Sequence, residues 1–217
     1  MVGYVPKNQK RQTSQVTYAI KAQLDRADPP IWRNLRLPGA TPLDALHRLI
    51  QAAFGWEDAH LHQFSVGDPY RSRVVYEPAP EEDIDLDLDL DEGPERVDES
   101  TVTVAELAPH TGDWFTYLYD FGDSWTHTIT VESVDEPDSV ELLPRCTDGR
   151  RMAPFEDSGG VSGWAEKVDA ARDDSHPDHA DVRGWLGLAP GQDFDPAQFD
   201  KDAIAVAISS VKQPSGD

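Results

Sequence analysis

The fold of this chain is decided by residues 114–131, whose sequence is Trp114-Phe-Thr-Tyr-Leu-Tyr-Asp-Phe-Gly-Asp-Ser-Trp-Thr-His-Thr-Ile-Thr-Val131. Two runs of aromatic and β-branched residues, which favour strands, flank the turn-forming segment Phe121–Ser124. This pattern predicts a β-hairpin. A two-residue turn would place Asp120 opposite Trp125, whereas a longer turn would shift that register.

The chain before this hairpin predicts a second hairpin followed by a helix. Residues 15–24 alternate apolar and polar side chains, as in a half-buried strand. A proline pair interrupts the pattern, and Ile31–Leu37 reads as the next strand. An apolar stripe at helical spacing over 43–54 predicts a helix, with Thr41 as its N-cap and Gly55 as its end.

The remaining segments predict short strands and then helices. His60–Val66 and Arg73–Tyr76 have strand character, and the capping-box pattern Thr103–Glu106 opens a short helix. Residues 135–163 are rich in proline, glycine and charge, which predicts a loop. Three C-terminal helices are expected, over 164–172, over 175–186 and from 200 onwards. This order indicates the α+β class with a mixed or antiparallel sheet, rather than a parallel α/β fold.

The composition is that of an acidic chain with a single cysteine. Among 217 residues, 41 Asp and Glu oppose 19 Lys and Arg, so the formal net charge is −22. This charge disfavours binding to DNA. The lone Cys146 excludes an internal disulfide and a four-cysteine zinc site. Met1–Gln15 lacks a signal-peptide pattern. The apolar run Ala203–Ile208 is far shorter than the ~20 residues that span a bilayer. A cytoplasmic protein without membrane contact is therefore expected.

A single domain is expected over 15–212, with flexible ends at 1–14 and 213–217. One acidic insertion interrupts it, because residues 81–99 carry 11 acidic side chains against a single arginine. Repulsion between these carboxylates predicts that 77–99 is solvated and disordered.

Three histidines and a carboxylate support a metal-binding hypothesis. His60 and His62 lie two apart on an expected strand, so their imidazoles project the same way. His127 lies on the hairpin beside Asp120. If these strands are neighbours, the four residues could ligate zinc, iron or manganese, and the ion could activate water for hydrolysis. The alternative is that they are core-edge residues in which carboxylates satisfy the imidazoles.

A second set of residues indicates a ligand-binding surface. Aromatic and acidic side chains around the hairpin turn either line a cleft or pack in the core. Arginines before Gly159 and Gly160 either hold a phosphate or carboxylate or pair with the protein's own carboxylates. The candidates are Trp56, Tyr119, Asp120, Asp123, Trp125, Arg145 and Arg151. No catalytic residue is assigned, and the partner is an unidentified protein or small molecule.

Five motifs follow one another along the chain. They are Pro29–Arg33, Ala52–Trp56, His60–Phe64, Tyr119–His127, and Pro144–Cys146 with Gly149. From about residue 15 to 210 the chain resembles the plasmid pRiA4b Orf-3-like family, whose members are often labelled insertion-element passenger proteins of TnpR type. The early hairpin, helix and strand are also similar to a β-grasp arrangement.

This resemblance implies a domain associated with a mobile element and without a settled activity. The expected function is therefore a binding or interaction module, with a metal-dependent hydrolase as the alternative. A resolvase, which the TnpR label implies, is not expected, because Phe199–Asp217 is neither basic nor of helix-turn-helix pattern. Ser158 stands where the family often has a second cysteine, so no two-cysteine metal or redox role is expected for Cys146.

Overall fold

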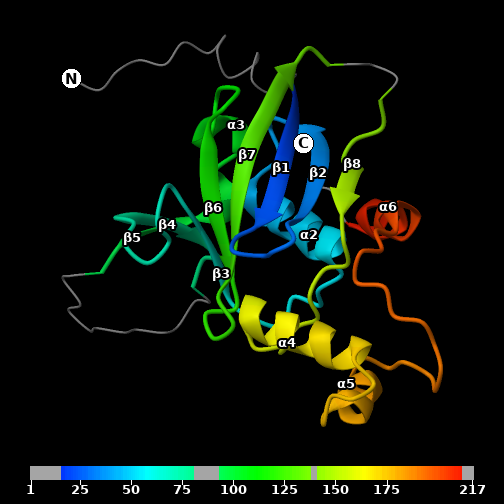
Figure 1. Cartoon of the computed structure of the whole chain (residues 1–217). Helices are drawn as coiled ribbons and strands as arrows, with labels where there is room; N and C mark the ends of the chain where they lie inside the picture. The colour runs from blue at the N-terminus through cyan, green and yellow to red at the C-terminus, as the bar shows by residue number, and fades with distance from the viewer. Residues whose placement is uncertain (1–15, 81–92, 138–140, 212–217) are drawn as a thin grey trace, which may run out of the picture.

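The computed structural model describes residues 16–80, 93–137 and 141–211 (Figure 1). These residues build one eight-stranded sheet in the order β5-β4-β3-β6-β7-β1-β2-β8. The strands are β1 Thr17–Leu24, β2 Ile31–Pro38, β3 His62–Ser65, β4 Val74–Glu77, β5 Glu95–Asp98, β6 Trp114–Tyr119, β7 Trp125–Asp135 and β8 Arg145–Arg150. Strands β4 and β5 pair in parallel, and the other neighbouring pairs are antiparallel. The predicted α+β class with a mixed sheet is confirmed.

Helices lie on one face and at one end of this sheet. In the described ranges they are α2 Leu43–Phe54, the 3-10 helix η1 Glu99–Thr101, α3 Val104–Leu107, α4 Gly160–Arg172, α5 His179–Trp185 and α6 Lys201–Ser210. Figure 1 shows α2 across one face of the sheet, and α4 with α5 below the end at which the β6–β7 turn lies. Within the described residues, no helix has the length and apolar character needed to cross a membrane.

Helix α2 carries the apolar stripe that forms the core with the sheet. Its buried apolar residues are Leu43, Ala45, Leu46, Leu49, Ile50, Ala53 and Phe54. Gly55 ends the helix in a left-handed conformation with φ of 73°, as predicted. The predicted N-cap is wrong, because Pro42 takes that position and the Thr41 hydroxyl donates instead to the Pro38 carbonyl over 2.7 Å.

The β6–β7 hairpin is confirmed, and it takes the longer of the two alternative turns. Tyr119 pairs with Trp125, so Asp120–Ser124 form the loop and the register differs by one residue from that of a two-residue turn. The Ser124 N–H closes the loop on the Asp120 carbonyl over 2.7 Å. This register puts Tyr117, Tyr119 and Trp125 in the buried core.

Strand β8 forms where a loop was expected over 135–163. Its sequence, Arg-Cys-Thr-Asp-Gly-Arg, has little strand propensity, so pairing with the edge of β2 must order it. The first predicted hairpin, β1–β2, is present. Strand β3 lies beyond β6 and β7, so the likeness to a β-grasp arrangement is limited to the order hairpin, helix, strand.

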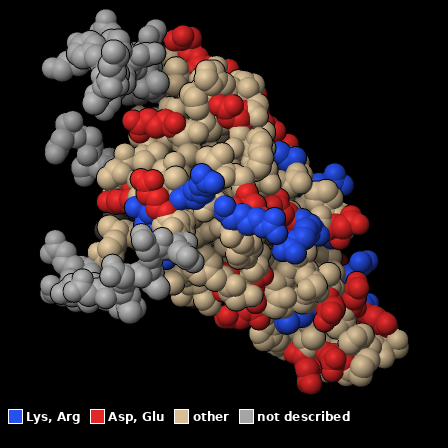
Figure 2. Space-filling model, turned by 90° about the vertical axis from the view of Figure 1, so that its left-hand side faces the viewer, with Lys and Arg blue, Asp and Glu red and all other residues tan. Residues whose placement is uncertain are grey.

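The end of the expected acidic insertion is ordered. Glu95–Asp98 form β5 beside β4, and the Asp98 carboxylate accepts a hydrogen bond from the Ser100 N–H at the start of η1. Residues 81–92, 1–14 and 213–217 lie outside the described residues. Figure 2 shows acidic side chains from top to bottom of one face, with basic side chains in a band across its middle.

Candidate functional site

Left-handed backbone conformations gather in four loops at one end of the sheet. In the described chain, the non-glycine residues with positive φ are Arg26, Asp58, Asp120, Ser124, Arg151 and Asp157. We call these loops, residues 25–30, 55–61, 120–124 and 151–159, the loop junction. Such conformations cost ~1–3 kcal/mol each and cluster at functional sites. The loop junction is therefore where a site is expected.

The buried Tyr119 hydroxyl joins two of these loops. It accepts hydrogen bonds from the N–H groups of Ala59 (3.0 Å) and His60 (3.3 Å), and it donates one to the Glu156 carboxylate. The second oxygen of Glu156 accepts from the Glu57 N–H over 2.9 Å. Burial and Glu156 raise the pKa of Tyr119 above its ordinary value, so the hydroxyl stays protonated. These bonds hold His60 close to the β8–α4 loop.

The side chains of three residues, each from a different loop, lie close together: His60, Asp120 and Asp157. His60 Nε2 lies 3.7 Å from Asp120 Oδ2 and 3.4 Å from Asp157 Oδ1. The three ligand atoms lie within 4.8 Å of one another. Asp120 Oδ1 accepts from the N–H groups of Gly122 (2.8 Å) and Asp123 (3.3 Å). These bonds fix the Asp120 carboxylate with Oδ2 toward His60.

The spacing in this cluster matches that of metal ligands. Two ligands held ~2.1 Å from one tetrahedral ion lie ~3.4 Å apart, whereas an N–H···O hydrogen bond measures ~2.9 Å. Among the described residues, no hydrogen bond joins His60 to either carboxylate. The Asp157 side chain is 78% exposed, so the cluster opens to solvent on that side. The cluster can therefore hold a divalent ion and leave coordination positions for water.

Of the four predicted metal ligands, the structure brings together only His60 and Asp120. Strand β3 begins at His62, and the His62 imidazole turns inward, with Nε2 2.9 Å from Glu99 Oε2. His127 is fully buried, and its Nδ1 donates to the Trp125 carbonyl over 3.2 Å. Burial lowers the pKa of His127 to about 3, so this imidazole is neutral. Both histidines belong to the core.

Sequence reasoning misses Asp157, because no pattern places the β8–α4 loop beside His60. The only local signal is that Asp157 follows Glu156 and precedes a glycine pair. It also misses a second cluster, in which His47 Nε2 lies 2.8 Å from Asp58 Oδ1 and Nδ1 lies 2.8 Å from the Tyr117 hydroxyl. The sequence signal for this second cluster was His47, a histidine within the apolar stripe of α2.

Beside the His60 cluster lies a cavity of about 700 Å³. It is lined by the β1–β2 loop, the β6–β7 loop, Arg151 and one side of α4 along the whole length of the helix. Two of the predicted ligand-binding residues, Asp123 and Arg151, are among the lining residues. Asp123 Oδ2 also accepts from the Gly159 N–H over 2.9 Å, which ties the turn to the start of α4. The cavity and the cluster thus share two loops.

The other predicted ligand-binding residues have structural contacts. Trp125 is buried in the core, and Trp56 donates from Nε1 to the Pro154 carbonyl while it stacks on Tyr119 with centroids 5.1 Å apart. Arg145 pairs with Glu141, with 2.6 Å between Nη2 and Oε1. The aromatic residues therefore pack the core beneath the loop junction and do not line its cavity.

Comparison with known proteins identifies the family. A family model described as plasmid pRiA4b ORF-3-like protein matches residues 16–203. Uncharacterized protein y4hQ of Sinorhizobium fredii is 33% identical over 193 residues, which cover 88% of this chain and 90% of that protein. The crystal structure of MM3350, a protein of unknown function from Methanosarcina mazei Go1, superposes with a TM-score of 0.73 at 30% identity and covers 88% of this chain and 98% of its own. This chain therefore belongs to the plasmid pRiA4b ORF-3-like family.

Proposed function

We propose that this protein is a metal-binding module that holds one divalent ion between His60, Asp120 and Asp157. The observation that carries this proposal is the spacing of 3.4 and 3.7 Å from His60 Nε2 to the two carboxylates, without a hydrogen bond to either. An ion at the centre would replace two weak contacts with three coordination bonds. It would also offset the repulsion between two neighbouring carboxylates.

The chemistry of the ligands selects the class of ion. One imidazole with two carboxylates suits manganese, iron(II) or zinc. Calcium and magnesium prefer shells made of oxygen, so His60 disfavours them. Three protein ligands leave at least one coordination position open, as in catalytic rather than structural sites.

A metal-dependent hydrolase is the second candidate function. It is favoured by the exposure of the Asp157 side of the cluster and by the neighbouring cavity of about 700 Å³. A bound ion would lower the pKa of its water to ~7 and so supply hydroxide near neutral pH. The substrate would then lie in the cavity between Asp123 and the start of α4.

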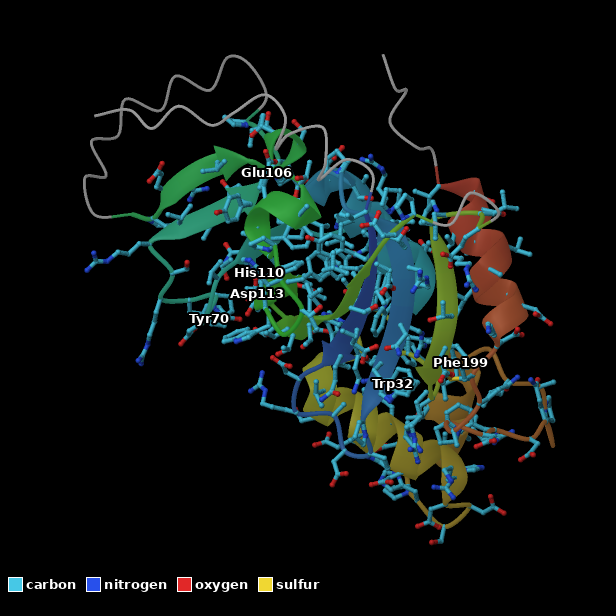
Figure 3. All side chains as sticks on the ribbon, turned by 90° about the horizontal axis from the view of Figure 1, so that it is seen from above. Trp32, Tyr70, Glu106, His110, Asp113 and Phe199 are labelled. Carbon is cyan, nitrogen blue, oxygen red and sulfur yellow. The ribbon has the colours of Figure 1, made fainter. Side chains whose placement is uncertain are left out.

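Elemental analysis of tag-free protein, purified without chelator, tests metal binding. We expect near-stoichiometric manganese, iron or zinc in the unaltered protein, and loss of the ion in His60→Ala and Asp157→Asn. Residue 157 is exposed, so its variant should fold. The matched control is His110→Ala, because His110 faces Asp113 at 3.3 Å in another exposed pair, which Figure 3 labels.

Two results would contradict metal binding at the His60 cluster. If the unaltered protein holds no metal, and added manganese, iron or zinc does not raise its melting temperature, the proposal is wrong. It is equally wrong if His60→Ala retains the ion at the level of the control.

Association with a mobile element, a TnpR-type passenger role and location in the cytoplasm stay predictions, and the net charge still disfavours DNA as a partner.

A further inference from the structure

The Arg33 guanidinium on β2 is buried without a carboxylate partner among the described residues. Arg33 is 3% exposed. Its Nε donates to the Ala53 carbonyl over 2.9 Å, and its Nη1 donates to the carbonyls of Trp32 (2.8 Å) and Arg150 (3.1 Å). No residue in the described ranges accepts a hydrogen bond from Nη2. The two N–H groups of Nη2 are therefore free within the described residues.

Two aromatic rings fix the position of this group. The centroids of Phe54 and Phe199 lie 5.0 and 5.1 Å from Arg33 Cζ. Gly149 makes room for one of them, because a Cβ at this position would lie 2.3 Å from the Phe199 ring. Figure 3 shows Phe199 beside β8, on the side of the molecule where α6 lies, with Trp32 on the neighbouring strand. The planar donor is thus held in one place before any ligand arrives.

The contacts of Arg33 compensate its charge only in part. Ala53 lies in the last turn of α2, where unpaired carbonyls and the helix dipole favour a cation. Burial lowers the pKa of Arg33 to about 10, so the group is still charged at neutral pH. Carbonyl groups carry no net charge, and a buried cation without an anion is costly. A bound anion would remove that cost.

Arg33 lines a cavity of about 430 Å³ between α2, the β8–α4 loop and α6. Most of the other lining residues are apolar, among them Phe54, Met152, Pro154, Phe155 and Ile204. The charged lining residues are Arg33, Arg151 and Asp200, and the Asp200 carboxylate is engaged by the Ala203 N–H at the start of α6 over 2.9 Å. The lining is therefore net positive in a chain whose formal charge is −22.

We propose that this cavity binds a small molecule with an apolar body and a single carboxylate, which pairs with Nη2 of the Arg33 guanidinium. A carboxylate can accept charge-assisted hydrogen bonds from the two N–H groups of Nη2, which the carbonyls leave free. A phosphate group brings more charge and more acceptors than one buried arginine can satisfy. The volume and the apolar walls fit a medium-chain or aromatic carboxylic acid. This site is separate from the His60 cluster and does not depend on it.

Calorimetric titration of the full chain, stripped of metal ions, tests this inference. The probes are octanoate and phenylacetate, with octanamide and phenylacetamide as neutral counterparts. We expect saturable binding of at least one carboxylate, and binding of its amide weaker by at least about tenfold, because the amide leaves the buried charge unpaired. Arg33→Met should weaken carboxylate binding by a similar factor. Arg71→Met is the matched control, because the Arg71 side chain is 86% exposed and does not line the cavity.

A second variant keeps the test decisive if Arg33→Met fails to fold. Ala207→Phe fills the cavity from α6 and leaves Arg33 in place, so it should abolish binding. The proposal is overturned if neither carboxylate binds, if acid and amide bind equally, or if binding survives Ala207→Phe. His60→Ala should bind the carboxylate as the unaltered protein does, so failure of the metal site and failure of this cavity give different results.

Discussion

The imidazole rings of His47 and His62 lie face to face, with centroids 3.5 Å apart and planes inclined by 4°. Each ring edge meets a different carboxylate, since His47 Nε2 lies 2.8 Å from Asp58 and His62 Nε2 lies 2.9 Å from Glu99. Burial, with a smaller contribution from His62, lowers the pKa of His47 to about 4, so this ring is neutral near pH 7. The stack joins α2 to β3 inside the core.

Glu99→Gln should destabilise the protein by ~1–3 kcal/mol, because a neutral amide replaces the buried carboxylate that bonds to His62. Glu99 is 4% exposed and both of its oxygens lie within 3.1 Å of His62 Nε2. Urea unfolding measures the change. Glu95→Gln is the control, because the Glu95 side chain is exposed and should change stability by less than ~0.5 kcal/mol. Equal effects of the two variants would contradict the buried pair.

Stability should fall as the pH falls below ~6.5, partly through His127. In the folded protein the pKa of His127 is about 3, whereas in the unfolded chain it is ~6.5. Between these values the unfolded chain binds a proton that the folded protein does not, so acid favours unfolding by ~1.4 kcal/mol per pH unit. Above pH ~6.5 neither state binds the proton and the slope vanishes.

His127→Gln isolates this contribution from that of the many carboxylates. Urea unfolding of both proteins between pH 7.5 and 4.5 gives the difference in unfolding free energy. That difference should shrink below pH ~6.5 by ~1.4 kcal/mol per unit, because only the unaltered protein loses the stability of a neutral, buried imidazole. A difference that does not change with pH would refute the pKa assigned to His127.

Tyr119→Phe should weaken metal binding by ~10–100-fold, although Tyr119 is not a ligand. The change leaves Glu156 and the N–H of His60 without the hydroxyl that holds them. Competition with a chelating dye measures the affinity. Tyr70→Phe is the control, because the exposed Tyr70 hydroxyl donates to Ser124 Oγ over 2.8 Å and contacts no ligand of the cluster. Equal affinities in the two variants would exclude a positioning role for Tyr119.

Gly160→Ala should destabilise the protein more than Gly187→Ala. Both glycines have positive φ, 69° and 70°, so both alanines carry the same backbone strain of ~1 kcal/mol. Only at Gly160 would the new Cβ meet backbone, at 2.6 Å from the Asp123 carbonyl oxygen. We expect ~1–3 kcal/mol of additional loss in thermal unfolding. Equal losses would mean that the start of α4 can move away from the β6–β7 turn.

The parts of the fold that follow from local patterns are predictable from the sequence. The alternation in 15–24 and the apolar stripe in 43–54 identify β1 and α2, because each period places one face in the core. Strand β8 is not predictable in this way, since its polar sequence is ordered by the edge of β2. The strand propensity of its residues says little about β8, because the main contribution of β8 to the sheet is its backbone pairing with β2.

The candidate site is predictable only in part, for the same reason. His60 and Asp120 are visible as a histidine and a carboxylate near strand ends. Asp157 joins them because Tyr119 and Glu156 bring distant loops together, and no local pattern records that contact. A period of two over 60–66 assigns His62 to the side of His60. The strand instead begins at His62, so His60 lies in the loop and the two imidazoles have separate environments.

Three buried polar side chains and the exposed Asp58 form a closed ring of hydrogen-bonding contacts. Asp58 Oδ1 meets His47 Nε2, His47 Nδ1 meets the Tyr117 hydroxyl, the Gln51 amide donates to that hydroxyl, and the Asp58 N–H returns to Gln51 Oε1 over 3.1 Å. Replacing His47, Gln51 or Tyr117 by an apolar residue removes one partner from each of its two neighbours in the ring. The Asp58 N–H keeps its bond to Gln51 whichever side chain residue 58 carries. The buried part of the ring, His47, Gln51 and Tyr117, therefore cannot be converted to an apolar contact by single substitutions that each preserve stability. Any mutational route between the polar and the apolar form must change at least two of these residues together.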